Sequence, residues 1–384
     1  MFDFLVIIGM VVFWYGLVPM AGALVKRYKW HMFRKRFDEL RLSPILDYGC
    51  YSREEGDSGT FRFVGNFESI TDEQTLWIRS EDLTIPVPLK NTETYLLPIQ
   101  KSGSIREIDP DDEAPEKIQW KRISTLTEGA RVFTGGLLAY RDGRWSFVST
   151  KENPLMVIFY DGPDNSFTTQ AIRAGRCRGE YWNAITPYSL AIGALCQIII
   201  AVLFFPRPAF RLTVIVSIIA LFVPLYPMIP PGLLFTVVYG RLSWKSRILR
   251  AYRDIARLPL RYFGNKIAPD SRQDSVLPNS EPYGFTCCAE LPHQALERIP
   301  LLLPELKRRE GDLWYIFGAL RSGEELPVQP KDYLATFGIL PGEPKAVARR
   351  CEILAYILEL AAWIILFAGI GLNIFFLRMI LILL

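Results

Sequence analysis

Hydrophobic residues collect in four runs along the chain, at residues 2–25, 186–205, 212–239 and 353–376. Each run is about 20 residues or longer, which is enough for a helix to cross a hydrocarbon core of about 30 Å. Soluble domains seldom contain core helices of this length and purity. The first run has no basic residue ahead of it and is longer than the apolar part of a signal peptide, so we expect an uncleaved helix. The pattern predicts an α-helical integral membrane protein with about four transmembrane helices.

The third run differs from the others because it contains four prolines, Pro224, Pro227, Pro230 and Pro231. Proline lacks an N–H, and its ring clashes with the preceding turn of a helix. We therefore expect a kinked helix, or a broken and re-entrant one. A membrane tolerates such a backbone only where protein or water covers the freed polar groups.

The polar stretch between the first two runs has a β pattern. Short alternating or β-branched segments stand between Gly, Pro, Asp and Asn residues from 47 to 161. The segment Arg141-Asp142-Gly143-Arg144 has the composition of a hairpin turn. The prediction is a β-rich soluble domain of the α+β type, with a small barrel or OB-like sheet. The expected strands are 60–67, 74–79, 83–88, 94–99, 131–140, 145–149 and 155–160.

These observations divide the chain into seven segments. They are transmembrane helix 1 (1–25), a basic amphipathic juxtamembrane helix (26–46), soluble domain 1 (47–185), a transmembrane hairpin of helices 2 and 3 (186–239), a second basic amphipathic helix (240–264), a smaller soluble domain 2 (265–350) and transmembrane helix 4 (351–384). The first amphipathic segment is expected to lie on the membrane surface or to continue helix 1. We also expect a short Arg-rich helix at 165–182 and a polar, proline-containing loop at 265–283.

The net charge is only +4, but the basic residues are concentrated after the first and third runs. By the positive-inside rule, both soluble domains face the cytoplasm of a multi-pass protein in the cell (inner or plasma) membrane. Because the basic stretches adjoin membrane helices, anionic lipid is the expected partner, rather than nucleic acid. A plain topology signal explains the same charges. The candidate membrane-surface contacts are Lys26, Arg27, Lys29, Arg34, Lys35, Arg36, Arg247 and Arg250.

Residues that carry chemistry are few. The six cysteines include no C-x-x-C pair, and the two histidines have no ligand neighbours at helical spacing. The acidic stretch 107–116 lacks the spacing and the glycine of an EF-hand. We expect no cofactor, no metal and no catalytic site. Glu359 is the one clear acid inside a membrane run, and such a carboxylate is a candidate intramembrane polar site. Snorkelling, or a hydrogen bond to a neighbouring helix, explains it equally.

Three blocks of sequence recur in the same order, which predicts an internal duplication. Residues 37–49 match 252–264, residues 128–138 match 310–320, and residues 141–162 match 321–342. The second block begins with Glu128-Gly129 in one copy and Glu310-Gly311 in the other. Two copies in the same membrane orientation form a parallel repeat. The alternative is that two stretches of similar architecture share turn glycines and arginines.

One part of the chain resembles a known family. A Gly129-Ala130 start, a Gly136-x-Leu138 hairpin and Lys151-x-x-Pro154 precede a short helix and a membrane run. This order is similar to the end of the GIDE/BAM ("beside a membrane") domain of mitochondrial ubiquitin ligases and their bacterial relatives. The resemblance covers at most residues 40–205 and implies a membrane-tethered β-rich domain between two helices. Ligase chemistry needs a zinc-binding RING, which this chain lacks.

The sequence favours a membrane-integral scaffold that presents its β-rich domains to an unknown membrane or cytoplasmic protein, or to another copy of the chain. The alternative is an oligomeric transporter or channel component that uses Glu359 and the proline-broken helix 3. A membrane-bound enzyme of unknown class is the third hypothesis.

Overall fold

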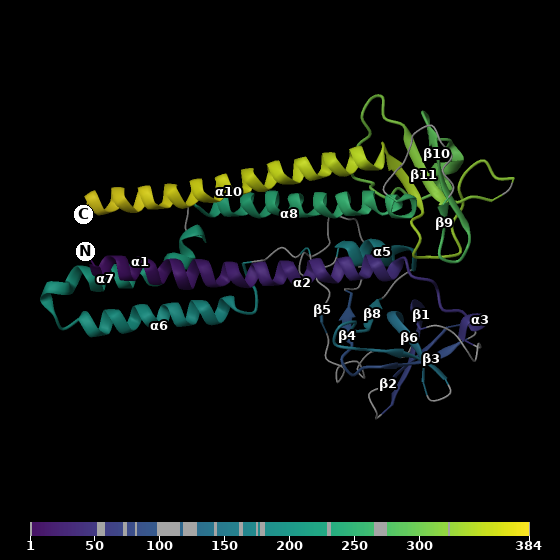
Figure 1. Cartoon of the computed structure of the whole chain (residues 1–384). Helices are drawn as coiled ribbons and strands as arrows, with labels where there is room; N and C mark the ends of the chain where they lie inside the picture. The colour runs from purple at the N-terminus through teal and green to yellow at the C-terminus, as the bar shows by residue number, and fades with distance from the viewer. Residues whose placement is uncertain are drawn as a thin grey trace. The chain divides into compact units, whose positions relative to one another are not determined.

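The computed structural model describes residues 2–51, 58–71, 75–80, 83–97, 116–117, 129–141, 144–160, 164–173, 176, 181–228, 232–264, 275–321 and 323–383. The acidic stretch predicted at 107–116 therefore lies almost wholly outside the described residues. The chain forms two compact units (Figure 1). A membrane unit contains Met1–Met32, Cys177–Leu249 and Ile353–Leu384. A soluble unit contains Phe33–Arg176 and Arg250–Glu352. Each unit is thus assembled from distant parts of the chain.

Within the described residues, three helices are long and apolar enough to cross a membrane: Leu5–Arg41, Thr186–Phe204 and Pro344–Phe376. The first consists of α1 (Phe2–Val11), a π-helical segment η1 (Val12–Leu17) and α2 (Val18–Arg41). The second is α6 (Thr186–Phe204), and the third lies in α10 (Pro344–Leu383). The chain therefore has the features of a membrane protein. The basic segment after the first run continues that helix, since α2 runs on to Arg41.

The third hydrophobic run is interrupted at its prolines. It contains α7 (Arg211–Leu221), the 3₁₀ segment η4 (Val223–Met228) and the start of α8 (Gly232–Arg257). A 3₁₀ turn, η3 (Pro208–Phe210), precedes α7. The apolar helix that ends at Leu221 is shorter than a membrane span. The predicted break thus occurs at Pro224 and Pro227, whose missing N–H groups and bulky rings disrupt regular helix, while Pro230 and Pro231 lie outside the described residues.

Pro19 explains the π-helical segment near the start of the chain. It has no N–H to donate to the carbonyl of Tyr15 one turn earlier, or to that of Trp14 in a π-type bond. Other groups of the membrane unit serve these carbonyls instead. The Tyr181 hydroxyl donates to the Tyr15 oxygen at 2.8 Å, and the Ser189 hydroxyl donates to the Trp14 oxygen. The irregular turn is thus satisfied inside the protein, as an apolar environment demands.

The soluble unit contains two sheets. The first has the strand order β3-β2-β1-β6-β8-β4-β5, with β7 paired to β6. All pairs are antiparallel except β4 with β8, so the sheet is mixed. The predicted strands are present within a few residues, and β6 pairs with β7 on either side of the predicted turn, whose residues 142–143 lie outside the described part of the chain. The bounds are β1 (Gly59–Thr71), β2 (Thr75–Arg79), β3 (Thr84–Pro88), β4 (Glu93–Leu96), β5 (Glu116–Lys117), β6 (Arg131–Arg141), β7 (Arg144–Val148) and β8 (Met156–Tyr160).

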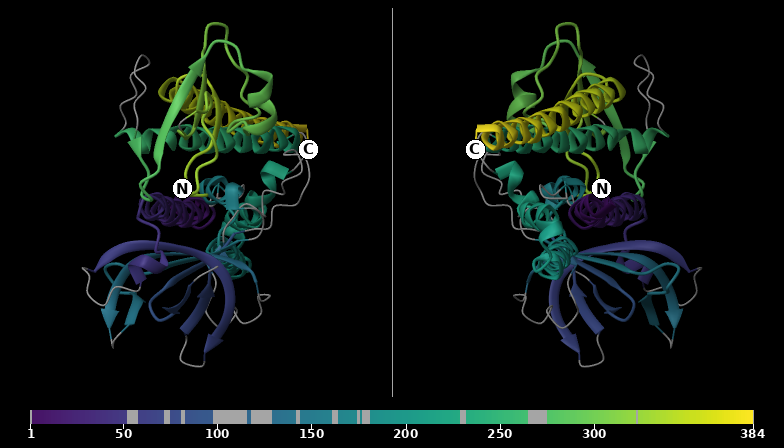
Figure 2. Two further views of the ribbon diagram at one scale, coloured as in Figure 1. Left: turned by 90° about the vertical axis from the view of Figure 1, so that its right-hand side faces the viewer. Right: turned by 90° about the vertical axis from the view of Figure 1, so that its left-hand side faces the viewer.

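Strand β1 is the longest strand of the first sheet and is strongly curved (Figure 2). Its register with β2 shifts between Phe67 and Ser69, which is a β-bulge. A bulge bends a strand and increases its twist. The apolar side chains of the sheet form a core that includes Phe63, Ile78 and Phe147, all nearly inaccessible to solvent. This curvature wraps the sheet around its own core.

The second sheet has the order β12-β11-β10-β9. Its strands are β9 (Ser275–Val276), β10 (Pro282–Cys288), β11 (Trp314–Ala319) and β12 (Gly338–Pro341). The loop predicted at 265–283 is wrong at its end, because β9 and the start of β10 lie there. Tyr283 in β10 is fully buried, so its aromatic ring belongs to the core rather than to a loop. Residues 265–274 lie outside the described part of the chain.

The two sheets share a register. Residues 132–135 of β6 pair with residues 156–159 of β8. Adding 182 to each of these residue numbers gives the pairs that β11 forms with β12. Thr94 pairs with Val157 in parallel, and Leu301 pairs with Ile339 in parallel. Ile339 is again the position of Val157 displaced by 182. Strand β10 pairs with β11 in the orientation that β1 has toward β6. The first sheet adds the β2–β3 hairpin, and the second adds β9.

Helices cover both sheets of the soluble unit. The end of α2 places Phe37 against Phe133 and against Phe167 of α5 (Asp164–Arg173), with ring centroids 5.6 and 5.4 Å apart. Helix α5 stops at Arg173, so the helix predicted as far as Trp182 is too long. Helix α8 likewise contributes buried side chains to the soluble unit, Tyr252 and Ile255. The remaining short helices are α3 (Tyr48–Tyr51), η5 (Pro259–Phe263) and α9 (His293–Arg298).

Candidate functional site

Four arginines from three separate parts of the chain gather in the soluble unit. This arginine cluster consists of Arg34 on α2, Arg176 after α5, and Arg250 and Arg253 on α8. The side chain of Arg176 is only 10 % exposed, and its Nη2 donates to Asp254. The Nε of Arg253 donates to the other oxygen of the same carboxylate at 2.8 Å. Asp254 therefore holds two of the four guanidinium groups together.

The electrostatics of the cluster act on Arg176. Burial lowers its pKa, Asp254 opposes this effect, and the guanidinium groups of Arg34, Arg253 and Arg250 lower it further, to about 10. Arg176 still carries its charge at neutral pH. The pKa is depressed because like charges and a lost hydration shell disfavour the charged form. The cluster therefore surrounds a buried arginine with three further positively charged side chains.

A second carboxylate borders the cluster. Glu352 accepts a hydrogen bond from Arg253 Nη1 at 3.0 Å and another from Arg257 Nη2 at 3.0 Å. Arg176, Arg253 and Arg257 thus share two carboxylates, Asp254 and Glu352.

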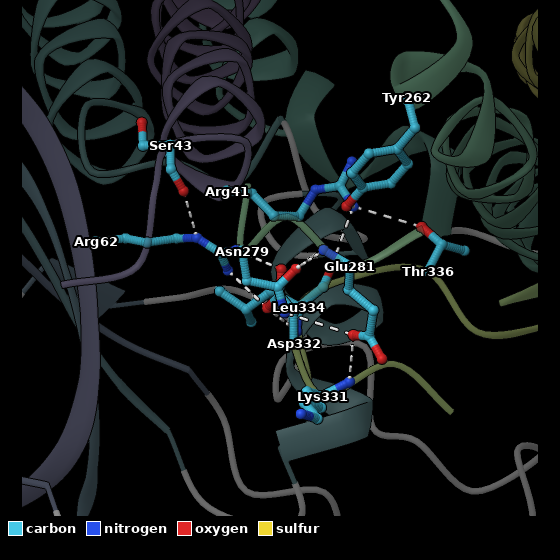
Figure 3. Close-up of polar contacts among 10 residues, drawn as sticks. All are labelled: Arg41, Ser43, Arg62, Tyr262, Asn279, Glu281, Lys331, Asp332, Leu334 and Thr336. Carbon is cyan, nitrogen blue, oxygen red and sulfur yellow. Dashed lines mark hydrogen bonds and ion pairs between the residues drawn. The ribbon is translucent and has the colours of Figure 1, made fainter. Parts of the chain in front are cut away.

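A second feature of the soluble unit is a buried ionic contact between the two sheets, which we call the clasp (Figure 3). Arg62 of β1 donates through both terminal nitrogens to the carboxylate of Asp332, and its Nη1 lies 3.0 Å from Oδ1. Both side chains are only 2 % exposed. The Nε of Arg62 donates to the Ser43 carbonyl at 2.7 Å, and Asp332 accepts from the Leu334 N–H at 3.0 Å. Most of the hydrogen-bonding capacity of this buried pair is satisfied.

Arg41 extends the clasp. Its side chain is fully buried, and Nη1 donates to the Tyr262 hydroxyl at 2.9 Å and to the Leu334 carbonyl at 3.2 Å. Its Nη2 binds Asp38 at 3.2 Å. Tyr262 lies on η5 (Figure 3). Arg41 therefore joins the last turn of α2 to η5 and to the segment around Leu334. A bidentate arginine has a fixed planar geometry, so these contacts set the relative position of the elements they join.

The membrane unit contains the predicted intramembrane acid. Glu359 Oε1 lies 3.8 Å from Arg27 Nη2, and the two side chains are 25 % and 44 % exposed. An opposite charge lowers the free energy of a carboxylate in an apolar environment. On the same helix, Asn373 accepts a hydrogen bond from the Gly232 N–H at 3.0 Å. Asn373 thereby satisfies one of the unpaired N–H groups at the start of α8.

The other predicted surface residues are distributed over both units. Lys26 is half-buried and Lys29 is exposed in the membrane unit, and Lys35 lies on the exposed side of α2, 4.0 Å from Glu39. Arg36 donates to the Pro154 carbonyl, and Arg247 is half-buried. Of the predicted set, the structure brings together only Arg34 and Arg250 in the cluster, while Arg27 faces Glu359.

Several residues of these sites were not predicted. Arg176 and Arg253 complete the cluster, and Arg41, Arg62 and Asp332 form the clasp. The signal available for Arg62 was a lone charge between two phenylalanines in a predicted strand. Among the described residues, no group of three or more His, Cys, Asp and Glu side chains is placed to hold a metal ion. Comparison with protein-family models, curated proteins and solved structures finds no match.

Proposed function

We propose that this chain is a non-enzymatic membrane scaffold that presents its two sheets as one rigid surface to a protein partner. The observation that carries the proposal is the clasp, in which Arg62 and Asp332 pair within the soluble unit at 2 % exposure each. A buried ion pair contributes little net stability, but it favours a single arrangement of the groups it joins. A fixed arrangement of two sheets is what a scaffold needs, because preorganised surfaces lose less entropy on binding.

The proposed scaffold has four transmembrane helices, with the proline-broken third run as the fourth, and it arose by duplication of a unit with a small OB-like barrel. The common register of β6 with β8 and of β11 with β12 supports duplication. So do Gly129 and Gly311, which are the second residues of the second repeated block and have φ angles of +87° and +88°. Few residues other than glycine adopt this conformation. Kinship with the GIDE/BAM domain is part of the same proposal.

We place the soluble domains in the cytoplasm, at the inner or plasma membrane, because the basic residues follow the first and third hydrophobic runs. Single cysteines at Asp142 and Ser322, in a background without native cysteines, test this orientation in intact cells. Protection of both from an impermeant thiol reagent until the membrane is opened supports the proposal. Labelling of Asp142→Cys from outside contradicts it.

Crosslinking in mild detergent tests the scaffold itself. A photoreactive residue at the exposed Tyr140 of β6, or at the exposed Val276 of β9, should capture a discrete partner or a second copy of the chain. The same probe combined with Arg62→Met should lose that product, since the two sheets are no longer held together. Arg131→Met is the matched control, because its partner Asp164 lies in the same part of the unit as β6. If Arg62→Met and Arg131→Met give equal amounts of the crosslinked product, the clasp does not have the role proposed for it.

The alternative proposal is an oligomeric transporter or channel component. The ion pair of Glu359 with Arg27 and the break in the third run are the observations that favour it. Glu359→Gln removes the negative charge and keeps the shape of the side chain. A transport role requires this variant to abolish uptake or ion flux in reconstituted vesicles. A scaffold requires only that the variant still folds and captures its partner.

A further inference from the structure

The soluble unit has a cavity of about 380 Å³ beside the second sheet. It is lined by the turn between β9 and β10, by the residues that follow β11, and by Lys331. Pro282 and Leu320 supply apolar lining, and the Leu320 N–H donates to the Pro282 carbonyl at 2.9 Å, which joins the two sides. Pockets that hold ligands usually have volumes of about 300–1,000 Å³. The cavity is therefore large enough to receive side chains of another molecule.

The turn that forms one wall of the cavity is held in a fixed conformation. The Leu277 N–H donates to the Glu281 carbonyl and the Ser280 N–H donates to the Leu277 carbonyl, both at 2.9 Å. Asn279 Oδ1 accepts from the Glu281 N–H at 3.2 Å. Ser280 has a φ of +63°, a conformation that residues other than glycine seldom adopt. Because these contacts fix the turn, this wall needs little ordering when a ligand binds.

The charged groups of the lining are two cations and one carboxylate, Arg321, Lys331 and Glu281. The Glu281 side chain is only 10 % exposed, and its carboxylate accepts from the Lys331 N–H at 2.9 Å and lies 4.0 Å from Arg321 Nη2 (Figure 3). Arg321 is half-exposed, and Lys331 is exposed, with no hydrogen bond or ion pair of its ammonium group among the described residues. The lining therefore has an excess of one positive charge, placed on groups that a ligand can reach.

We propose that the cavity binds a carboxylate side chain from an acidic segment of the protein partner. Guanidinium and ammonium groups both form charge-assisted hydrogen bonds to carboxylates. The single negative charge of a carboxylate matches the excess charge of the lining, whereas a phosphorylated side chain has a charge of about −1.5 to −2 at pH 7. Lys331 directly precedes Asp332, so the clasp also fixes the position of this wall. The inference rests on the scaffold function proposed above and adds the chemistry of the partner.

The test uses the full chain in a non-ionic detergent and measures peptide binding by NMR titration of the peptide. The probes are acetyl-Ala-Glu-Ala-amide, the same peptide with glutamine, and the same peptide with phosphoserine. The cavity variant is Arg321→Gln with Lys331→Gln. The matched control is Arg79→Gln with Lys90→Gln, an exposed arginine that also lies 4.0 Å from a glutamate and an exposed lysine, both outside the cavity. Thermal unfolding without peptide establishes that both proteins fold, and the single variants replace the pair if the double variant does not.

We expect wild type and control to bind the glutamate peptide equally, and the cavity variant to bind it about fivefold more weakly, since two partly exposed ionic contacts are lost. No binding of the glutamate peptide to wild type, or equal binding by wild type and cavity variant, overturns the proposal. So does equal binding of the glutamine peptide, or tighter binding of the phosphoserine peptide.

The photoreactive residue at Val276 separates this inference from the scaffold function. Loss of the crosslinked product in the cavity variant, but not in the control, supports an acidic partner at this site. A product that persists in the cavity variant leaves the scaffold in place and overturns the docking site. No product from Val276 or Tyr140 in wild type, with the glutamate peptide still bound, overturns the scaffold function and leaves the cavity as a carboxylate site.

Discussion

Arg62→Met tests the physical role of the clasp. The substitution leaves the Asp332 side chain at 2 % exposure, with the Leu334 N–H at 3.0 Å as its remaining donor among the described residues. An uncompensated charge in such a place destabilises a protein by about 3–5 kcal/mol. For a unit of about 250 residues, each kcal/mol lowers the Tm by about 2–4 °C, so the expected shift is roughly 6–20 °C. The apolar stem of methionine limits the loss of packing, so most of this shift reports the charge.

The assay is thermal unfolding of the full chain in detergent, followed by tryptophan fluorescence and by hydrogen exchange of β10 and β11. Asp332→Leu combined with Arg62→Met removes both charges, and we expect this pair to recover most of the lost stability. Arg131→Met is the control, because the 38 % exposure of Arg131 limits its ion pair to about 1 kcal/mol or less. If Arg62→Met unfolds at the wild-type temperature, or if the double variant is less stable than the single one, the clasp does not hold the sheets as we describe.

Three further predictions concern other parts of the molecule. Asn373→Ala leaves the Gly232 N–H without its acceptor and should destabilise the membrane unit by about 1–3 kcal/mol, measured by thermal unfolding in detergent. Gly232→Ala should be about equally destabilising, because a Cβ there overlaps the Asn373 carboxamide. An unchanged unfolding temperature in either variant would contradict this. Tyr181→Phe removes the donor to the Tyr15 carbonyl and should lower stability by about 0.6 kcal/mol, with Tyr188→Phe, at an exposed site, as the control. Cys287 and Cys288 are half-buried, and this partial burial raises the pKa of both thiols. Maleimide labelling at pH 7, followed by mass spectrometry, should therefore be slower than at Val276→Cys and should accelerate as the pH rises; equal rates at pH 7 would contradict this.

The sequence pattern located the regular elements well. The strands of the first sheet were predictable because alternation and turn residues act over a few positions, as in the hairpin that joins β6 to β7. The break in the third run followed directly from its prolines. Pro19 acts by the same local mechanism, since its missing N–H changes the helix around Tyr15. This irregularity was not predicted, because Pro19 lies within a long apolar run that otherwise has the pattern of a regular helix.

The sites were harder to predict because their partners are distant in the sequence. Arg62 alternates with Phe61 and Phe63, so the pattern assigns its side chain to the solvent side of β1. That side is covered by residues near Asp332, which lies 270 positions further along the chain. The cluster likewise depends on how α2 and α8 pack. Charge density along the sequence indicated Arg34 and Arg250, but it could not show that Arg176 joins them.

The 270 positions between Arg62 and Asp332 also have a consequence for synthesis. At about 5–20 residues per second, the ribosome needs roughly 15–50 s to deliver the aspartate after the arginine. During that interval the rest of the first sheet, the hydrophobic segments at 186–239 and the strands β9, β10 and β11 are made, and only β12 of the second sheet follows Asp332. Arg62 must therefore stay hydrated until its partner arrives. Water can leave this pair only after residue 332 has been made, and a nascent chain that stops earlier keeps the Arg62 guanidinium without its carboxylate.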